Sequence, residues 1–191
     1  MTLLCDIAFK YGTGKCPQIK LHNTEWYFKE FNNRRNSVKK VFEMGVGGGP
    51  GDLLYCPNYT VGASMYMWRD FFPNAQIYGI DILPELAFKD GRIETFQCDQ
   101  GDKKKLLEII NNIGRDIDLV VDDASHLIKH QVSCCLAIMP LLKKGAIYVI
   151  EDVRGGKRNY ILDRLKEYNP ELIEPLSGVR YNDDRLFVMR K

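Results

Sequence analysis

Short apolar runs alternate with longer amphipathic stretches along most of this chain, and this alternation limits its possible folds more than any other feature. Five runs rich in β-branched or aromatic residues predict buried strands at 40–45, 76–82, 92–98, 118–122 and 146–151. Apolar residues at helical spacing predict helices over 3–11, 23–32, 63–72, 103–113, 127–143 and 158–168. A last strand over 185–190 is expected to lie antiparallel to a strand near 172–176. Together these elements predict an α/β fold, with a mostly parallel sheet covered by helices on both faces.

The length and composition of the chain favour one domain. Its 191 residues, 45% of them hydrophobic, suffice for one sizeable core but not for two ordinary domains. We therefore expect a single domain over 1–191, with a helical segment over 1–39 and a core over 40–191. Six cysteines without a CxxC pair are expected to be reduced and mostly packed in the interior.

Charge and hydropathy limit the possible partners. A net charge of +2 gives no global electrostatic reason to expect a nucleic-acid partner. Every apolar stretch is shorter than the roughly 20 residues that span a bilayer. Asp6 and Lys10 interrupt the first residues too early for a signal peptide. We expect a soluble, cytoplasmic protein with no membrane partner.

Two glycine-rich segments depart from the known nucleotide-binding motifs. Counted from Gly45, the dinucleotide pattern GxGxxG requires glycine at position 50, where Pro50 stands. The segment GTGKC around Gly14 lacks the upstream glycine of a phosphate-binding loop, and Cys16 stands where Ser or Thr would bind Mg²⁺. What remains is an acidic residue followed by two glycines, Glu43-Met44-Gly45-Val46-Gly47. Asp81, at the end of the next strand, suits a ribose diol because a carboxylate can accept two hydroxyl hydrogen bonds.

A second acidic region follows the later strands. Residues 122–126, DDASH, place two carboxylates and a histidine at one strand end, and Glu151-Asp152 closes the following strand. Carboxylates from adjacent strand ends can share a hard cation such as Mg²⁺. The alternative is that Asp123 or Ser125 only caps the helix that follows.

The motifs EMGVGG, IYGIDI, FQCDQ and DLVVDDASH, in this order, resemble those of class I S-adenosylmethionine-dependent methyltransferases. More narrowly, GASMYMWRDFFPNAQIYGID, DDASHLIKHQ and YVIED resemble the sugar O-methyltransferases of the mycinamicin and tetracenomycin pathways, which act on deoxysugars such as rhamnose. The opening FKYGTGKCPQIKLHNTEWY is similar to a segment of related glycan and macrolide enzymes. The resemblance implies a Rossmann-like sheet of seven strands, S-adenosylmethionine as cofactor and a divalent metal, Mg²⁺ or another cation.

The resemblance also implies roles for individual residues in cofactor binding. Glu43 and the backbone of the loop at Gly45 and Gly47 would hold the methionine end of the cofactor, and Asp81 its ribose. Asp99 and Gln100, after the third strand, match the position that reads adenine. Because successive residues leaving a strand point in different directions, Asp122 can face the cofactor while Asp123 faces the acceptor side. Asp99 and Gln100 could instead form a capped turn. Ser64 either caps the helix over 63–72 or reaches the cofactor carboxylate, and capping is the preferred interpretation.

For catalysis, the resemblance assigns Asp123 and Asp152 as metal ligands and His126 as the general base. A structural histidine at a helix start is the alternative for His126. The spacing places His126 and His130 four residues apart, on one face of the same predicted helix, with a structural role preferred for His130. The third protein ligand is not identified, and Asp52 is a weak candidate.

The function expected from these features is transfer of a methyl group to a hydroxyl of a sugar in a glycan or a glycosylated small molecule. Three alternatives stay open: a metal-dependent methyltransferase of a catechol-like or other small diol, a non-catalytic cofactor-binding scaffold, and an RNA or protein methyltransferase, which the near-neutral charge disfavours. The chain is shorter than the enzymes it resembles, which leaves open that it is one domain of a longer polypeptide. Its oligomeric state is also left open.

Overall fold

The structure is a computed structural model that describes residues 1–47, 56, 58–153, 155–174 and 185–191. Its helices are α1 (Leu3–Tyr11), α2 (Asn23–Phe31), α4 (Ala63–Phe71), α5 (Lys103–Ile113), α6 (Ile128–Ile138) and α7 (Arg158–Arg164). Its strands are β1 (Lys40–Met44), β2 (Gln76–Asp81), β3 (Lys89–Asp90), β4 (Ile93–Gln97), β5 (Leu119–Asp122), β6 (Ile147–Ile150), β7 (Glu171–Ile173) and β8 (Leu186–Arg190). None of the helices in these ranges is long and apolar enough to cross a membrane.

The strands form one sheet in the order β3-β4-β2-β1-β5-β6-β8-β7. Strands β4, β2, β1, β5 and β6 are parallel, and β8 lies antiparallel between β6 and β7, as predicted. The sheet has one strand more than expected, because the two-residue β3 pairs antiparallel with β4 at the edge. The chain order reverses between β1 and β5, so their carboxyl ends border the crevice in which open α/β sheets bind ligands.

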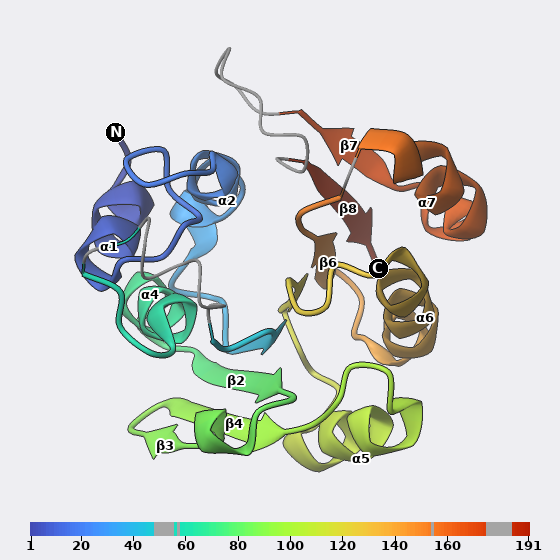
Figure 1. Cartoon of the computed structure of the whole chain (residues 1–191), viewed down its shortest axis with the longest axis horizontal. Helices are drawn as coiled ribbons and strands as arrows, with labels where there is room; N and C mark the ends of the chain where they lie inside the picture. The colour runs from blue at the N-terminus through green and yellow to red at the C-terminus, as the bar shows by residue number, and fades with distance from the viewer. Residues whose placement is uncertain (48–55, 57, 154, 175–184) are drawn as a thin grey trace.

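Helices cover both faces of the sheet (Figure 1): α1, α2 and α4 lie on one face, and α5, α6 and α7 lie on the other. The central strands β1, β5 and β6 are buried on both sides, which explains why their sequences are almost continuous apolar runs. Successive side chains of a strand point to opposite faces of the sheet, so they belong to two separate hydrophobic clusters. Val41 packs with α1, α2 and α4, whereas its neighbour Phe42 packs with α5, α6 and α7.

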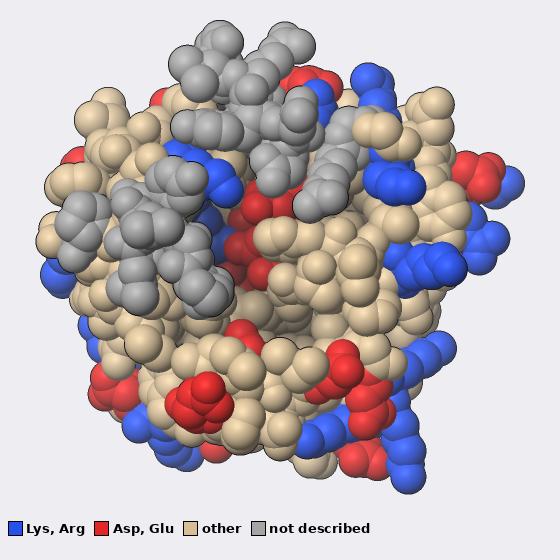
Figure 2. Space-filling view, viewed as in Figure 1, with Lys and Arg blue, Asp and Glu red and all other residues tan. Residues whose placement is uncertain are grey.

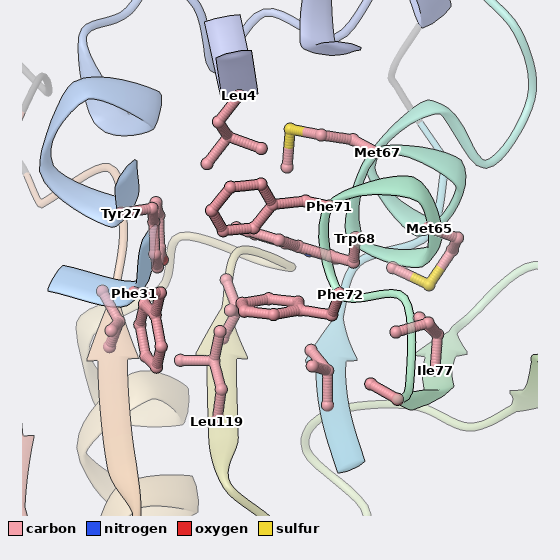
Figure 3. Packing of buried hydrophobic residues seen from close by; sticks show 14 of the residues in the cluster. Leu4, Tyr27, Phe31, Met65, Met67, Trp68, Phe71, Phe72, Ile77 and Leu119 are labelled. Atoms are coloured by element: carbon pink, nitrogen blue, oxygen red, sulfur yellow. The ribbon is translucent and has the colours of Figure 1, made fainter. Parts of the chain in front are cut away.

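The cluster under α1, α2 and α4 is rich in aromatic rings (Figure 3). Trp68 of α4 is fully buried, and its ring lies edge-on to that of Tyr27, with 4.9 Å between the centroids. Edge-to-face pairs add about 0.5–1.5 kcal/mol to the stabilisation from buried area. The same packing fixes the Trp68 Nε1 atom, which donates a hydrogen bond to Glu43 Oε2 (2.6 Å). The aromatic core thus extends directly to the end of β1.

Two helical predictions differ from the structure. The helix expected over 127–143 begins at Ile128 and ends at Ile138, followed by a 3-10 turn over Met139–Leu141. Pro140 accounts for the early end, because proline has no N–H to continue the helix. The helix expected over 158–168 likewise ends at Arg164, and a 3-10 turn covers Lys166–Tyr168.

Candidate functional site

A cavity of about 210 Å³ lies over the carboxyl ends of β1, β5 and β6. Its walls come from the segment between α1 and α2, from the glycine loop after β1, from the start of α4 and from the ends of β5 and β6. Figure 2 shows Asp and Glu side chains gathered in a hollow in the middle of this face. Of the residues assigned from the sequence, the cavity lining includes Gly45, Gly47, Ser64, Asp123, His126 and Asp152.

The glycine loop leaves β1 in a conformation that only glycine adopts easily. Gly45 has φ +98°, and a Cβ atom there would lie 2.2 Å from the carbonyl oxygen of Asp123. A larger residue would therefore push apart the ends of β1 and β5. A Cβ atom on Gly47 would in turn lie 2.3 Å from Leu86 Cδ1. These contacts explain why positions 45 and 47 are glycine. Gly48, Gly49 and Asp52 lie outside the described residues.

Asp81 holds this loop from the end of β2. Its Oδ2 atom accepts hydrogen bonds from the backbone N–H groups of Val46 (3.0 Å) and Gly47 (3.1 Å), and its Oδ1 atom accepts one from Leu83 (3.1 Å). A carboxylate offers about four acceptor positions. Asp81 can therefore accept one ribose hydroxyl while keeping all three backbone hydrogen bonds, rather than the two hydroxyls expected from the sequence.

Three polar side chains converge at the ends of β5 and β6. One candidate ligand atom each from Asp123, His126 and Asp152 lies within 4.8 Å of the other two. His126 Nε2 is 3.0 Å from Asp123 Oδ1 and 3.9 Å from Asp152 Oδ2. The Asp152 side chain is 9% exposed, and its Oδ1 atom has no hydrogen-bond partner among the described residues. A buried carboxylate oxygen without a partner fits a cation that prefers oxygen ligands.

The backbone at this point is strained. His126 (φ 51°) and Asp152 (φ 53°) are two of the three non-glycine residues with positive φ in the described ranges. Such conformations cost about 1–3 kcal/mol each and cluster at functional sites. The turn at His126 also places it before α6, so the prediction that His126 and His130 share a helix face is wrong.

The pKa values show an excess of buried carboxylates. The hydrogen bond to Asp123 raises the pKa of His126 to about 9. Burial, together with the charges of Asp123 and Glu151, raises the pKa of Asp152 to about 8. Burial likewise raises the pKa of Glu43 to about 7. His126 and Asp152 therefore hold protons at neutral pH, and a bound metal would displace such protons.

Lys15, which the sequence analysis did not assign to the site, lies at its centre. Its Nζ atom is 3.2 Å from Glu43 Oε1 and 2.6 Å from Glu151 Oε2, and it donates a hydrogen bond to Asp123 Oδ2. Although burial opposes its charge, these three carboxylates raise the pKa of Lys15 well above its usual value. The only sequence motif that drew attention to Lys15 was GTGKC, and it does not match a phosphate-binding loop.

A second hydrogen-bonded network lies beneath the cavity. Gln100 donates through Nε2 to Asp122 Oδ1, and its Oε1 atom accepts from the backbone N–H (3.1 Å) and the hydroxyl (2.7 Å) of Ser125. Tyr148 donates to Asp122 Oδ2 (2.9 Å), and Asp122 is fully buried. The side chains of Gln100 and Asp122 are therefore hydrogen-bonded to each other, and neither lines this cavity. Their contacts with the cofactor stay predictions.

The remaining candidates occupy varied positions. Asp99 is exposed beyond β4 and accepts a hydrogen bond from Gly101 N–H (2.7 Å), while Asp102 is the residue that caps α5. The capping interpretation of Ser64 is wrong: the N-cap residue of α4 is Gly62, with no side-chain hydrogen bond. Glu43 is fully buried and does not line the cavity. All six cysteines are buried thiols outside any disulfide, as predicted.

Known proteins that are similar to this chain in sequence or in fold are methyltransferases. Mycinamicin VI 2''-O-methyltransferase of Micromonospora griseorubida is 38% identical to the chain over 150 residues, which are 78% of the chain and 36% of that protein. The 8-demethyl-8-alpha-L-rhamnosyl tetracenomycin-C 2'-O-methyltransferase of Streptomyces olivaceus is 32% identical over 152 residues, 79% of the chain and 38% of that protein. The solved structure of MycE methyltransferase from the mycinamycin biosynthetic pathway, in complex with Mg, SAH and mycinamycin VI, matches with a TM-score of 0.75 and 28% identity.

The chain has the class I methyltransferase fold and is related to the sugar O-methyltransferases. The MycE match covers 98% of the chain and 54% of the MycE chain. This sugar O-methyltransferase homologue therefore spans a little over a third of the length of the two curated relatives and about half of the solved one. No protein-family model matches it.

Proposed function

We propose that the chain transfers the methyl group of S-adenosylmethionine to a hydroxyl of a sugar, a deoxysugar such as rhamnose on a glycosylated small molecule, with the assistance of a divalent cation. The observation that carries the proposal is the convergence of Asp123, His126 and Asp152 on the cavity that the glycine loop also lines. The relatives support it, since one is named for O-methylation of mycinamicin VI and another for O-methylation of a rhamnosyl tetracenomycin.

In the proposed arrangement, the glycine loop and Asp81 bind the cofactor, and Asp123 and Asp152 hold the cation. The positive charge of the donor disappears in the transition state, so the protein contributes mainly by aligning the hydroxyl with the methyl group and the sulfur. His126 lies 38% exposed at the cavity wall, and its Nε2–H faces Asp123 Oδ1 (3.0 Å). In the neutral ring, the other nitrogen is the one that can accept the proton of that hydroxyl. When bound, the cation would polarise the sugar hydroxyl and balance the carboxylates that hold a proton on His126.

An apolar groove adjoins this cavity and suits the remainder of the acceptor. It has a volume of about 360 Å³ and shares His126 with the cavity. Its apolar part comes from Leu127, which is 56% exposed, with Ile128 and Val153, and the remainder is lined by His126, Lys129, His130, Gln131 and Lys157. An exposed apolar side chain beside polar ones suits a ligand with one polar and one apolar part, such as a glycoside with a hydrophobic aglycone.

Methyl transfer from labelled S-adenosylmethionine to rhamnosylated small molecules tests the proposal. We expect turnover with Mg²⁺, a loss of at least about a hundredfold with EDTA, and recovery when Mg²⁺ is restored in excess. Cofactor affinity, measured by calorimetry on the same samples, should persist in EDTA. Transfer that EDTA leaves unchanged would remove the cation from the proposal, and absence of cofactor binding would overturn it.

Replacement of Asp81 by asparagine should weaken the binding of S-adenosylmethionine by roughly 10- to 100-fold. The reason is that hydrogen bonds to a charged group contribute about 1.5–3 kcal/mol. Two of them position the glycine loop, at Val46 and Gly47. Calorimetric titration measures the change. Asp90→Asn is the matched control, since Asp90 is an exposed aspartate outside the cavity, and equal affinity of the two variants would contradict the role of Asp81.

A further inference from the structure

Gln100 follows β4, yet its side chain reaches the turn after β5, over residues 123–126. Strands β2 and β1 lie between β4 and β5 in the sheet, so no strand pairing brings these two segments together. The segment after β4 also packs closely on α6. Cys134 Sγ donates to the backbone oxygen of Gln100 (3.4 Å), and a Cβ atom on Gly101 would lie 3.4 Å from the His130 ring. Gln100 is therefore buried between α6 and the turn.

The amide of Gln100 is bound at both ends. Its Nε2 atom donates to Asp122 Oδ1, and its Oε1 atom accepts from the backbone N–H (3.1 Å) and the hydroxyl (2.7 Å) of Ser125. The two contacts flank residues 123 and 124 in the chain. An ionised carboxylate only accepts and a backbone N–H only donates, so the side chain at position 100 must donate at one end and accept at the other. Glutamine meets both requirements, whereas methionine, which is similar in length, has no donor and only a weak acceptor.

The turn held by Gln100 has a strained backbone at the proposed base. His126 follows Ser125 directly and has φ 51°. Such conformations persist only when the surrounding contacts impose them. The Asp123 N–H donates to Met44 O (3.0 Å) and fixes the start of the turn. The bond between Ser125 and Gln100 fixes the residue just before His126. Gln100 is thus placed to set the direction of the His126 ring without lining the cavity itself.

We infer that Gln100 is a positioning residue, which holds Ser125 so that the strained turn directs the His126 ring toward the acceptor hydroxyl. This inference rests on His126 as the base of the proposed function. Partners that orient functional side chains contribute about 10- to 100-fold, because a small displacement of a reacting group lowers its rate by similar factors. The contact with adenine that the sequence predicts for Gln100 has a different consequence, since its loss lowers cofactor affinity. The two roles can therefore be separated by experiment.

Methyl transfer by Gln100→Met at saturating cofactor and acceptor provides the first test. We expect the rate to fall by about 10- to 100-fold, because the turn loses the bond that holds Ser125. Affinity for S-adenosylmethionine, measured by calorimetry, should stay within about threefold of the wild type. Gln76→Met is the matched control and should keep the wild-type rate, since Gln76 is the first residue of β2, at the opposite end of that strand from Asp81.

A double-variant cycle shows whether Gln100 acts through His126. Positioning has no effect once the positioned side chain is absent, so Gln100→Met should change the residual rate of His126→Ala by less than about threefold. The losses from two independent residues would instead multiply, as they would if Gln100 only stabilised the fold. A further loss of about tenfold or more in the double variant would therefore overturn the inference.

Near-ultraviolet circular dichroism identifies the variants that retain the fold. If Gln100→Met does not fold, Gln100→Asn takes its place in both experiments. Asparagine keeps the amide but is one methylene shorter, so it cannot reach both Asp122 and Ser125, and the same loss of rate is expected.

A folded Gln100 variant with the rate of the Gln76→Met control, beside an inactive His126→Ala, would overturn the inference and leave the proposed function intact. Lower cofactor affinity with an unchanged rate at saturation would also overturn it, in favour of the contact with adenine. Full activity of His126→Ala would overturn the inference together with the proposed base. Absence of methyl transfer by the wild type would overturn it together with the proposed function.

Discussion

Replacement of His126 by alanine should lower the rate of methyl transfer by about 10²- to 10⁴-fold, the usual contribution of general acid–base catalysis. Affinity for S-adenosylmethionine should change by less than about threefold, because the glycine loop and Asp81 form the proposed cofactor site. His126 contacts Asp123 and lies at the cavity wall, where an acceptor hydroxyl would approach. Single-turnover kinetics at saturating cofactor measure the rate, and calorimetry measures the affinity.

His22→Gln is the control for this experiment, since His22 is outside the lining of the cavity that contains His126 and is hydrogen-bonded to Glu25 (2.8 Å). Turnover by His126→Ala at the rate of that control would eliminate His126 as the base. A Mn²⁺ titration distinguishes a base from a ligand. Loss of a base should leave Mn²⁺ affinity within about threefold, whereas loss of a metal ligand should weaken it far more.

Replacement of Trp68 by alanine should lower the free energy of unfolding by at least about 4 kcal/mol. Truncation of a buried tryptophan costs about 3–5 kcal/mol through lost burial and the cavity left behind. Trp68 is fully buried, and its removal would also deprive the buried Glu43 carboxylate of a hydrogen-bond donor. Urea unfolding followed by circular dichroism at 222 nm measures the loss.

The chain offers a matched control in Trp26, the other of its two tryptophans. Trp26 is partly exposed at the edge of the same cluster, so Trp26→Ala should cost less than about 2 kcal/mol. Equal losses for the two variants would contradict the view that Trp68 links the aromatic core to the site. Because domains of this size are stable by only about 5–15 kcal/mol, the loss expected for Trp68→Ala is a large fraction of the total.

The sequence by itself determined the α/β class, the order of the elements and most strand positions. The reason is that strands buried on both faces need continuous apolar runs, which are visible without coordinates. It also determined which residues stand at strand ends. In a parallel sheet these ends share one edge, and so Gly45, Asp123 and Asp152 were placed correctly beside one another. Their assigned roles in cofactor and metal binding stay predictions.

Only the tertiary structure decided which side chains face the cavity and what balances their charge. Asp122 and Gln100 are hydrogen-bonded to each other and do not line the cavity, which the sequence did not show, because the direction of a side chain at a strand end depends on packing from both sides. Their assignment to the cofactor stays a prediction. Lys15 lies more than 100 positions before Asp123 and Glu151 in the chain, and no local pattern relates a lysine to carboxylates that distant. The sequence shows where charged residues occur; the fold determines which of them are buried together.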